Sequence, residues 1–363
     1  HHERREQAYL LVPEQFTLQS DIHLLEALEV NAVMDIKVKS FASLAREVLG
    51  RIEGDSRTFV GRAARELVFY QAIAEENENL AIYKNAHLQS GVLTAISDSV
   101  AALHAAGISA EGLSALADRE DLPSELRRKC IELGRIQQRY ETLLGDRYQD
   151  VEARLQTLLE VVPKATYLRK VHLYFDAFQS MSPLELAIVE ALNQLGVAVH
   201  VVVTLPYGAA YATEMPAAVG EHEAYAGSWA FLTALRKIAG ASLRIREVHA
   251  AEAVLPDLAA VAKGGFSQVK TPPLPSAPHL RLMQSPSTEI EVEAVAALLR
   301  KRIVDDGLRW RDITVSVTRP EAYFPLIRRI FAAHGIPVFI DQKRYITENP
   351  LLQSVFAAIA MVE

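Results

Sequence analysis

The first 52 residues alternate short apolar runs with helical periodicity. Residues 8–13 (AYLLVP) form an apolar run that ends at a proline, and residues 36–41 (IKVKSF) alternate as a half-buried strand does. A helical period follows each run, over 16–29 and 43–52. Strands and helices that alternate at this spacing predict a parallel α/β sheet.

From residue 56 to residue 165 the pattern is helical throughout. Long amphipathic stretches follow one another, and Gly107, Pro123, Gly145 and Pro163 separate them. No run in this stretch has the alternation or the length of a strand. We therefore predict an all-helical insertion at 56–165 in the first α/β domain.

The strand pattern returns after the helical stretch. Residues 171–178 (VHLYFDAF) and 197–206 (VAVHVVVTLP) are apolar runs of strand length. Between them, a serine–proline start and a final glycine predict a capped helix over 182–196. We expect the first α/β domain to comprise residues 1–55 and 166–206.

The rest of the chain carries a second α/β pattern. Residues 207–279 form a connecting region, and its proline-rich end (KTPPLPSAPH) predicts an extended linker. Strand-like segments then alternate with helical periods. These segments are 280–285, 312–319 and 336–341. We expect residues 280–363 to begin a second α/β domain.

The composition is that of a soluble globular protein, with 50% hydrophobic and 23% charged residues. No apolar stretch reaches the roughly 18 to 20 residues of a membrane span. The polar N-terminus does not look like a secretion signal, so we expect a cytoplasmic protein without membrane contact. The single Cys130 excludes an internal disulfide and any site built from several cysteines. Because the formal charge is −7, any DNA contact must come from a local groove.

An aspartate follows the returning strand at its carboxyl end, in the order Asp176, Ala177, Phe178, Gln179. Nucleotide-hydrolysing folds place a carboxylate there to hold magnesium. On its own, Asp176 is better explained as a loop residue that accepts a backbone hydrogen bond. A phosphate-binding loop of the form G-x-x-x-x-G-K-[ST] occurs nowhere in the chain. Because this loop is missing, we predict no catalytic residue in this chain. The histidines lack metal-ligand spacing, so we predict no metal site.

The same segment resembles the second motif of UvrD/Rep-type superfamily 1 helicases, which reads D-E-x-Q after a buried strand. In those enzymes the aspartate holds magnesium and the glutamate activates the attacking water. Ala177 stands at the glutamate position here, and a methyl group cannot accept a proton. The resemblance implies two RecA-like domains of the P-loop NTPase type, and a chain that does not hydrolyse ATP.

The chain is also similar to the AddB/RexB-type subunit of AddAB/RexAB-type helicase–nucleases. Four segments carry this resemblance, in the chain order of that family. They are LLVPEQFTLQ (10–19), VKSFASLAREVL (38–49), YFDAFQSMSPLE (174–185) and RWRDITVSVTRPEAYFPLIRRIFAAHGIPVFIDQKR (309–344). In that family, this subunit is an inactivated helicase that accompanies a motor subunit and threads the 3′ strand. Several members also read a recombination hotspot sequence.

The resemblance places several residues on single-stranded DNA. Gln15, Thr17 and Phe41 match positions that face the single strand, and Arg46 adds a cation to this mix of amide and aromatic groups. Arg319 matches a position that contacts the strand or the interdomain cleft. From the residues alone, a core role for Phe41 and a helix-start role for Gln15 are the better explanations. A surface role for Arg319 is an equal alternative.

These features predict a non-hydrolytic, DNA-binding scaffold subunit of an ATP-dependent helicase/nuclease complex in double-strand break repair and recombination. The implied partners are a motor subunit of the AddA/RexA type and DNA, mainly single-stranded. Family members often carry arginine and tryptophan where this chain has Ser43 and Arg46, so hotspot reading is not implied. No cofactor is expected in this chain. ATP with magnesium and an iron–sulfur cluster are implied only for a full-length parent.

Two alternatives stay open. The chain can be a fragment of an active ATP-dependent helicase or nuclease whose ATP-binding loop and nuclease domain lie outside it. A phosphate-binding loop directly upstream would favour this alternative. The chain can also be an unrelated α/β protein with a structural role, although four motifs in the right order argue against that.

Overall fold

The structure is a computed structural model that describes residues 7–52, 57–145, 147–205, 225–246, 248, 255–264, 273–342 and 349–361. The chain divides into two compact units, His1–Pro275 and Ser276–Glu363. The division falls within the proline-rich stretch 270–279. Parts of the predicted connecting region, 207–224, 247, 249–254 and 265–272, lie outside the described residues.

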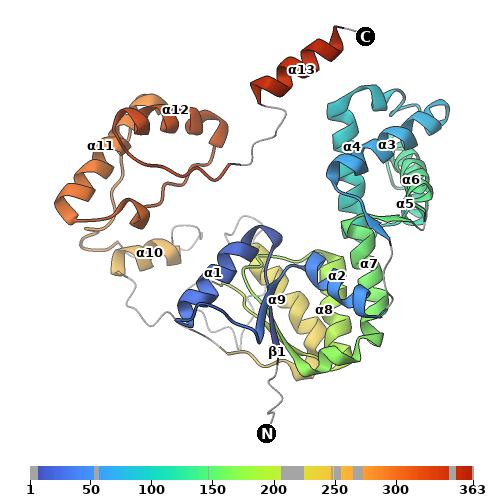
Figure 1. Cartoon of the computed structure of the whole chain (residues 1–363), viewed down its shortest axis with the longest axis horizontal. Coiled ribbons are helices and arrows are strands. Elements are labelled where there is room, and N and C mark those ends of the chain that lie inside the picture. The colour runs from blue at the N-terminus through green and yellow to red at the C-terminus, as the bar shows by residue number, and fades with distance from the viewer. Residues whose placement is uncertain are drawn as a thin grey trace. The chain divides into compact units, whose positions relative to one another are not determined.

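Four parallel strands form the main sheet of the first unit (Figure 1). They are β1 (Gln7–Leu11), β2 (Ile36–Lys39), β5 (Val171–Phe175) and β6 (Ala198–Val201). Their order in the sheet is β2-β1-β5-β6. Leu11 lies opposite both Lys39 and Phe175, and Phe175 lies opposite Val201. The prediction of a parallel α/β sheet is therefore confirmed.

One face of this sheet is covered by a large apolar core. Tyr9, Leu11, Leu173 and Phe175 point into it and are fully buried. The helices that complete this core are α2 (Phe41–Ile52), α7 (Val151–Val161), α8 (Pro183–Leu195) and α9 (Ala226–Ala239). Successive strand residues point to opposite faces, so Tyr174 lies on the other face, where it is 40% exposed.

The direction of chain progression reverses between β1 and β5. The chain passes from β1 to β2 in one direction and from β5 to β6 in the other. Because crossovers between parallel strands are right-handed, α1 (Thr17–Ala27) and α8 lie on opposite faces (Figure 1). The carboxyl ends of β1 and β5 thus form a topological switch point. Open α/β sheets bind ligands at such points.

Helix α8 begins and ends as its sequence predicts. The Ser182 hydroxyl accepts a hydrogen bond from the Glu185 amide, and the Glu185 carboxylate accepts one from the Ser182 amide at 2.8 Å. Gly196 follows the helix with a φ of 85°, a left-handed conformation that costs glycine little. This helix packs Leu184, Ile188 and neighbouring side chains onto the sheet.

Between β2 and β5 the chain forms a helical part with a core of its own. Its main helices are α3 (Arg62–Glu76), α4 (Ser90–Ala105), α5 (Ala110–Ala117) and α6 (Ser124–Leu144). The Phe69 ring stacks on the Tyr140 ring with centroids 4.1 Å apart. Two short strands, β3 (Thr58–Phe59) and β4 (Tyr148–Gln149), pair in parallel. The prediction of purely helical structure is wrong at these strands, because two residues carry no periodicity.

No single helix among the described residues is long and apolar enough to cross a membrane. The pair α4 and α5, bent by 94°, matches such a span by length and composition only. Ile96 and Val100 of α4 and Leu113 of α5 lie in hydrophobic cores of the helical part. Their apolar composition is therefore explained by packing inside the protein.

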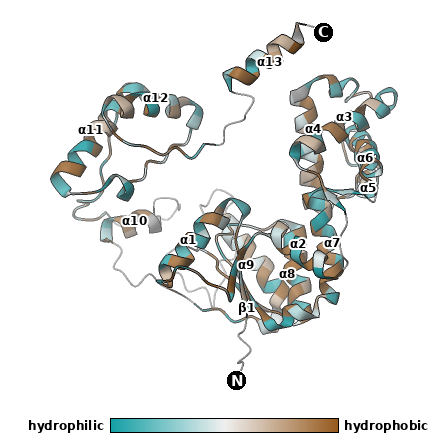
Figure 2. Ribbon diagram, viewed as in Figure 1, coloured by the Kyte–Doolittle hydropathy of each residue, from teal (hydrophilic) through white to brown (hydrophobic). Residues whose placement is uncertain are grey.

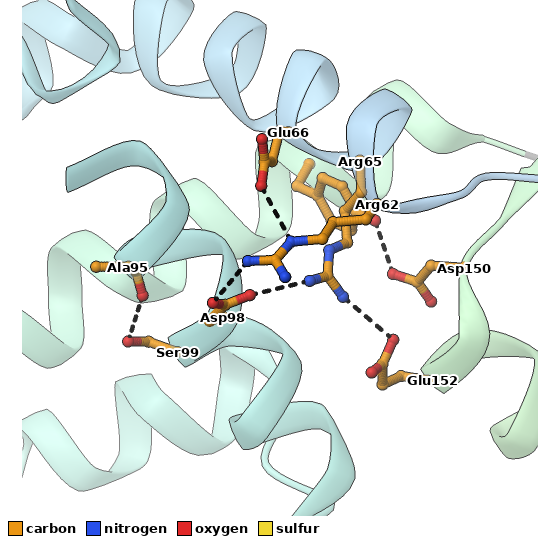
Figure 3. Close-up of polar contacts among 9 residues, drawn as sticks. Arg62, Arg65, Glu66, Ala95, Asp98, Ser99, Asp150 and Glu152 are labelled. Atoms are coloured by element: carbon orange, nitrogen blue, oxygen red, sulfur yellow. Dashed lines mark hydrogen bonds and ion pairs between the residues drawn. The ribbon is translucent and has the colours of Figure 1, made fainter. Parts of the chain in front are cut away.

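Arginines of α3 link α4 to the residues that start α7 (Figure 3). Arg65 lies 3.2 Å from an Asp98 oxygen and 3.8 Å from a Glu152 oxygen. The buried Tyr140 hydroxyl donates to Asp150 at 2.7 Å. Burial raises the pKa of Glu152, and the neighbouring Asp150 charge raises it further, while Arg65 opposes the rise. The ionised form of Glu152 is therefore unfavourable in the folded protein.

We expect Glu152→Gln to stabilise the protein at neutral pH. The folded pKa is raised, so the contribution of this carboxyl is fully present below the unfolded pKa and is lost as pH rises through the folded pKa. Glutamine cannot titrate. Free energies of unfolding from urea denaturation should coincide below the ordinary pKa of 4.5 and diverge above it, with the wild type lower. A less stable variant at pH 7 would show that the ion pair with Arg65 outweighs burial.

The second unit contains helices α11 (Thr288–Asp306), α12 (Pro320–Ala333) and α13 (Pro350–Ala360). Val292 and Ala296 of α11 pack against Ile327, Ile330 and Phe331 of α12. The segments predicted as strands, 280–285, 312–319 and 336–341, form no strand in the described part of this unit. That prediction is wrong here, since apolar alternation marks burial and a strand also needs a hydrogen-bonded neighbour.

Candidate site at the carboxyl edge of the sheet

The segments that follow β1, β2 and β5 stay side by side beyond the strand ends. The Val12 amide donates to the Lys39 carbonyl at 2.9 Å, and the Asp176 amide donates to the Leu11 carbonyl at 2.9 Å. These bonds extend the parallel ladder by one residue on each side of β1. Gln15 and Thr17 therefore follow β1 at the switch point, and Phe41 and Arg46 follow its neighbour β2.

A tight turn leads from β1 into α1 and carries two of the predicted residues. Glu14–Phe16 form a single 3₁₀ turn, and the Thr17 hydroxyl donates to the Glu14 carbonyl at 3.0 Å. Gln15 is exposed and Thr17 is half-buried. The Gln15 amide can thus reach a ligand directly. Because the Thr17 hydroxyl already donates to this turn, it can only accept a hydrogen bond from a ligand.

Phe41 lies in the core, with 5% of its surface exposed. Its ring centroid is 5.6 Å from that of Phe175 and 5.8 Å from that of Phe178. Such tilted and edge-on contacts are favourable for aromatic rings. The ring offers no open face to a nucleobase in this structure. The core explanation fits its placement, and the three rings join the start of α2 to the turn after β5.

Helix α2 starts with a reciprocal pair of serines. The Ser40 amide donates to the Ser43 hydroxyl at 2.9 Å, and the Ser43 amide donates to the Ser40 hydroxyl at 3.2 Å. This is the geometry of a capping box with serine in place of glutamate. Arg46 follows about 8 Å along the helix axis from Phe41. It is exposed, and no hydrogen bond or ion pair engages it within the described structure.

The turn after β5 carries the altered helicase motif. Asp176 and Gln179 are both exposed, while Phe178 turns inward to Phe41. Ala177 has a φ of 61°, in the left-handed region that disfavours side chains, at a cost of roughly 1 kcal/mol. With Ala177 in this conformation, the Phe178 ring points into the core, and the side chains of Asp176 and Gln179 point to solvent.

The donors around Asp176 do not fit a nucleotide-hydrolysing or iron–sulfur site. Among the described residues, no three His, Cys, Asp or Glu side chains gather closely enough to hold a metal ion. Ala177 offers no base beside Asp176, and Cys130 is a single, buried thiol. An iron–sulfur cluster needs several cysteine ligands. Among the described residues, this edge of the sheet presents the exposed amides of Gln15 and Gln179 and the exposed guanidinium of Arg46.

Arg319 belongs to the second unit, where it precedes α12. Its carbonyl accepts hydrogen bonds from the amides of Ala322 at 3.1 Å and Tyr323 at 3.2 Å. Its exposed guanidinium interacts with Tyr323, whose hydroxyl donates to Glu291 at 2.8 Å. Arg319 therefore holds the start of α12 through its backbone and presents its charge to solvent.

Two features that shape this edge were not predicted from sequence. One is the aromatic cluster of Phe41, Phe175 and Phe178, and the other is the serine pair at the start of α2. The S-x-x-S spacing directly after a strand was the available signal for the serine pair. The cluster joins residues more than 130 positions apart, and periodicity gives no information at that range.

Comparison with known proteins identifies the family. Residues 1–254 match the family model described as "ADDB, N-terminal". The chain belongs to this family. The B subunit of the ATP-dependent helicase/deoxyribonuclease of Alkaliphilus oremlandii is 24% identical over 361 residues, which cover 98% of this chain and 31% of the relative. The protein of the same name from Bacillus cereus is 24% identical over 374 residues, covering 99% and 31%.

The resemblance to AddB/RexB-type subunits, carried by four motifs, is thus confirmed over nearly the whole chain. This member of the AddB family spans about a third of the length of the curated relatives that it matches. The same coverage, 98% of this chain and 31% of the relative, applies to the protein of that name from Alkaliphilus metalliredigens.

Proposed function

We propose that this chain is part of a non-hydrolytic scaffold subunit of an ATP-dependent helicase/nuclease complex that contacts single-stranded DNA. The observation that carries the proposal is the turn Asp176–Gln179 at the switch point of a member of the AddB family. It has the position of a helicase motif, but Ala177 cannot accept a proton. The complex would act in double-strand break repair and recombination.

In this proposal the parallel sheet belongs to the first of two RecA-like domains, formed by residues 1–55 and 166–206. The helical part, 56–165, is its insertion. Residues 207–279 connect it to residues 280–363, which begin the second RecA-like domain. The reversal of chain direction between β1 and β5 supports the first assignment, because nucleotide-binding sheets bind their ligands at that place.

Gln15, Thr17 and Arg46 are the proposed DNA contacts of the first unit, and Arg319 is that of the second. Exposed amide and guanidinium groups suit phosphates and base edges. The buried Phe41 serves this site by holding the turn after β5 in place. The chain needs no cofactor for this role.

The proposed partner is a motor subunit of the AddA/RexA type, in the cytoplasm. The relatives are named as one subunit of an enzyme, which implies an assembly with another, and their length leaves room for further domains. ATP with magnesium and an iron–sulfur cluster would belong to a longer parent. In the alternative, an active helicase or nuclease fragment, the ATP-binding loop lies outside this chain and Ala177 still leaves hydrolysis without its base.

We expect the chain to bind a fluorescently labelled single-stranded oligonucleotide, with affinity that falls steeply as salt increases. Arg46→Ala should weaken binding about 3- to 10-fold and reduce the salt slope by about one, because one phosphate contact is lost. Fluorescence anisotropy over a salt series measures both quantities.

Arg51→Ala is the matched control, since Arg51 lies on the same helix but is paired with Glu47 at 3.1 Å. Its effect on affinity should stay below about twofold. Equal losses in the two variants, or no binding in low salt, would contradict DNA contact at this edge.

A further inference from the structure

The surface of α1 and of the loop after it is unusually apolar. Within residues 14–35, six large apolar side chains are at least 38% exposed. They are Phe16, Leu18, Ile22, Leu28, Val30 and Met34. Helix α1 buries none of its own residues, and Leu18 and Ile22 lie one turn apart on one side of it. Apolar exposure concentrated in this way is typical of a surface that another molecule covers.

The same segment is acidic. Residues 14–35 contain five carboxylates and no lysine or arginine, which gives a formal charge of −5. The carboxylates are Glu14, Asp21, Glu26, Glu29 and Asp35. Figure 2 shows hydrophilic and hydrophobic residues together along α1. Beyond Thr17, the carboxylates of this segment repel nucleic-acid phosphates and anionic membranes. The complementary surface is apolar and basic, as a protein can provide.

The neighbouring strand β2 disfavours binding by addition of a partner strand to the sheet. β2 is the edge strand of the described sheet, and two of its four residues are Lys37 and Lys39. Lysines on an edge strand oppose the addition of another strand. Lys39 is also held by Glu47 at 2.8 Å. A partner is therefore expected to dock on α1 as a helix, with its side chains packed between Leu18 and Ile22.

We propose that residues 18–35, which are α1 beyond Thr17 and the loop after it, form a docking surface for an amphipathic, basic helix of a partner protein. The apolar side of that helix covers Leu18 and Ile22, and its lysines or arginines meet the carboxylates around them. This surface is separate from the amide and guanidinium groups proposed to bind DNA. Its occupation requires neither DNA nor nucleotide.

The full chain is titrated with a labelled synthetic helical peptide that carries leucine on one face and lysine on the other. We expect saturable binding by anisotropy, and slower amide hydrogen exchange within 17–28 when the peptide is bound. Leu18→Glu with Ile22→Glu should weaken binding about tenfold or more. Leu18→Gln with Ile22→Gln, which adds no charge, should also weaken it and separates lost apolar contact from repulsion.

Leu67→Glu is the matched control, because Leu67 is 70% exposed on helix α3 and Leu18 is 72% exposed on α1. It should leave peptide affinity unchanged, and a leucine–glutamate peptide of the same pattern should not bind. Unchanged affinity in both double variants would overturn the proposal. Sedimentation that shows a dimer of the chain, abolished by the double variants, would also overturn it by making a second copy the occupant. Oligonucleotide binding, measured in parallel, should be unaffected.

Discussion

Glu132→Gln is expected to lower the free energy of unfolding by about 3 kcal/mol. Glu132 lies on α6 and is 4% exposed. Its carboxylate accepts hydrogen bonds from the backbone amides of Ala81, Ile82 and Tyr83 at 2.9 to 3.1 Å. A glutamine keeps one accepting oxygen and turns an NH₂ group toward backbone donors. At least one of these three amides would then lose its partner at the buried end of the side chain.

Urea denaturation followed by far-ultraviolet circular dichroism measures this loss. Glu125→Gln is the matched control, since Glu125 lies on the same helix but is exposed and paired with Lys129 at 2.8 Å. It should change stability little, because solvent screens an exposed ion pair. A similarly small effect for both variants would show that water replaces the carboxylate at the 81–83 loop.

Glu132 also shows where sequence reasoning ends. A glutamate in an amphipathic helix suggests a solvent-facing position, and its partners lie about 50 residues earlier in the chain. Nothing in the local pattern distinguishes Glu132 from Glu125. Only the folded chain shows that one carboxylate holds a loop and the other faces solvent.

The parallel sheet of the first unit could be predicted because its strands are locally marked. Strands β2, β5 and β6 lie within the apolar runs identified from sequence, and β1 starts one residue before its run. The first three of these strands are each followed by a helix or a turn with its own signal, such as the cap at Ser182 after β5. The short strands β3 and β4 carry no such mark, and they form through pairing between residues 90 positions apart.

In the second unit the same kind of apolar run gave the wrong element. Val317 and Ile340 do pack against the core of α11 and α12, as buried strand residues would. Their burial was predictable, but strand formation depends on a hydrogen-bonded neighbour and not on apolar alternation. The candidate site divides in the same way. Exposed Gln15 and Arg46 are where a ligand can reach them, whereas Phe41 faces the core.

Phe41→Ala is expected to lower the free energy of unfolding by about 3 to 5 kcal/mol, because it leaves a cavity between Phe175 and Phe178. Phe41→Leu retains most of the volume and should cost about 1 kcal/mol. Phe16→Ala, at a side chain that is 38% exposed, is the matched control. It should lower the free energy of unfolding by much less than Phe41→Ala does. Urea denaturation of the three variants measures these differences.

Oligonucleotide affinity of the same variants separates the two roles assigned to Phe41. If Phe41 positions the turn after β5, the leucine variant should bind single-stranded DNA as the wild type does. The alanine variant should bind less well, because Phe178 loses its neighbour and the adjacent Gln179 can shift. Stacking on a base requires an aromatic face, which leucine lacks. A stable leucine variant with weakened DNA binding would therefore show that the ring leaves the core to meet DNA.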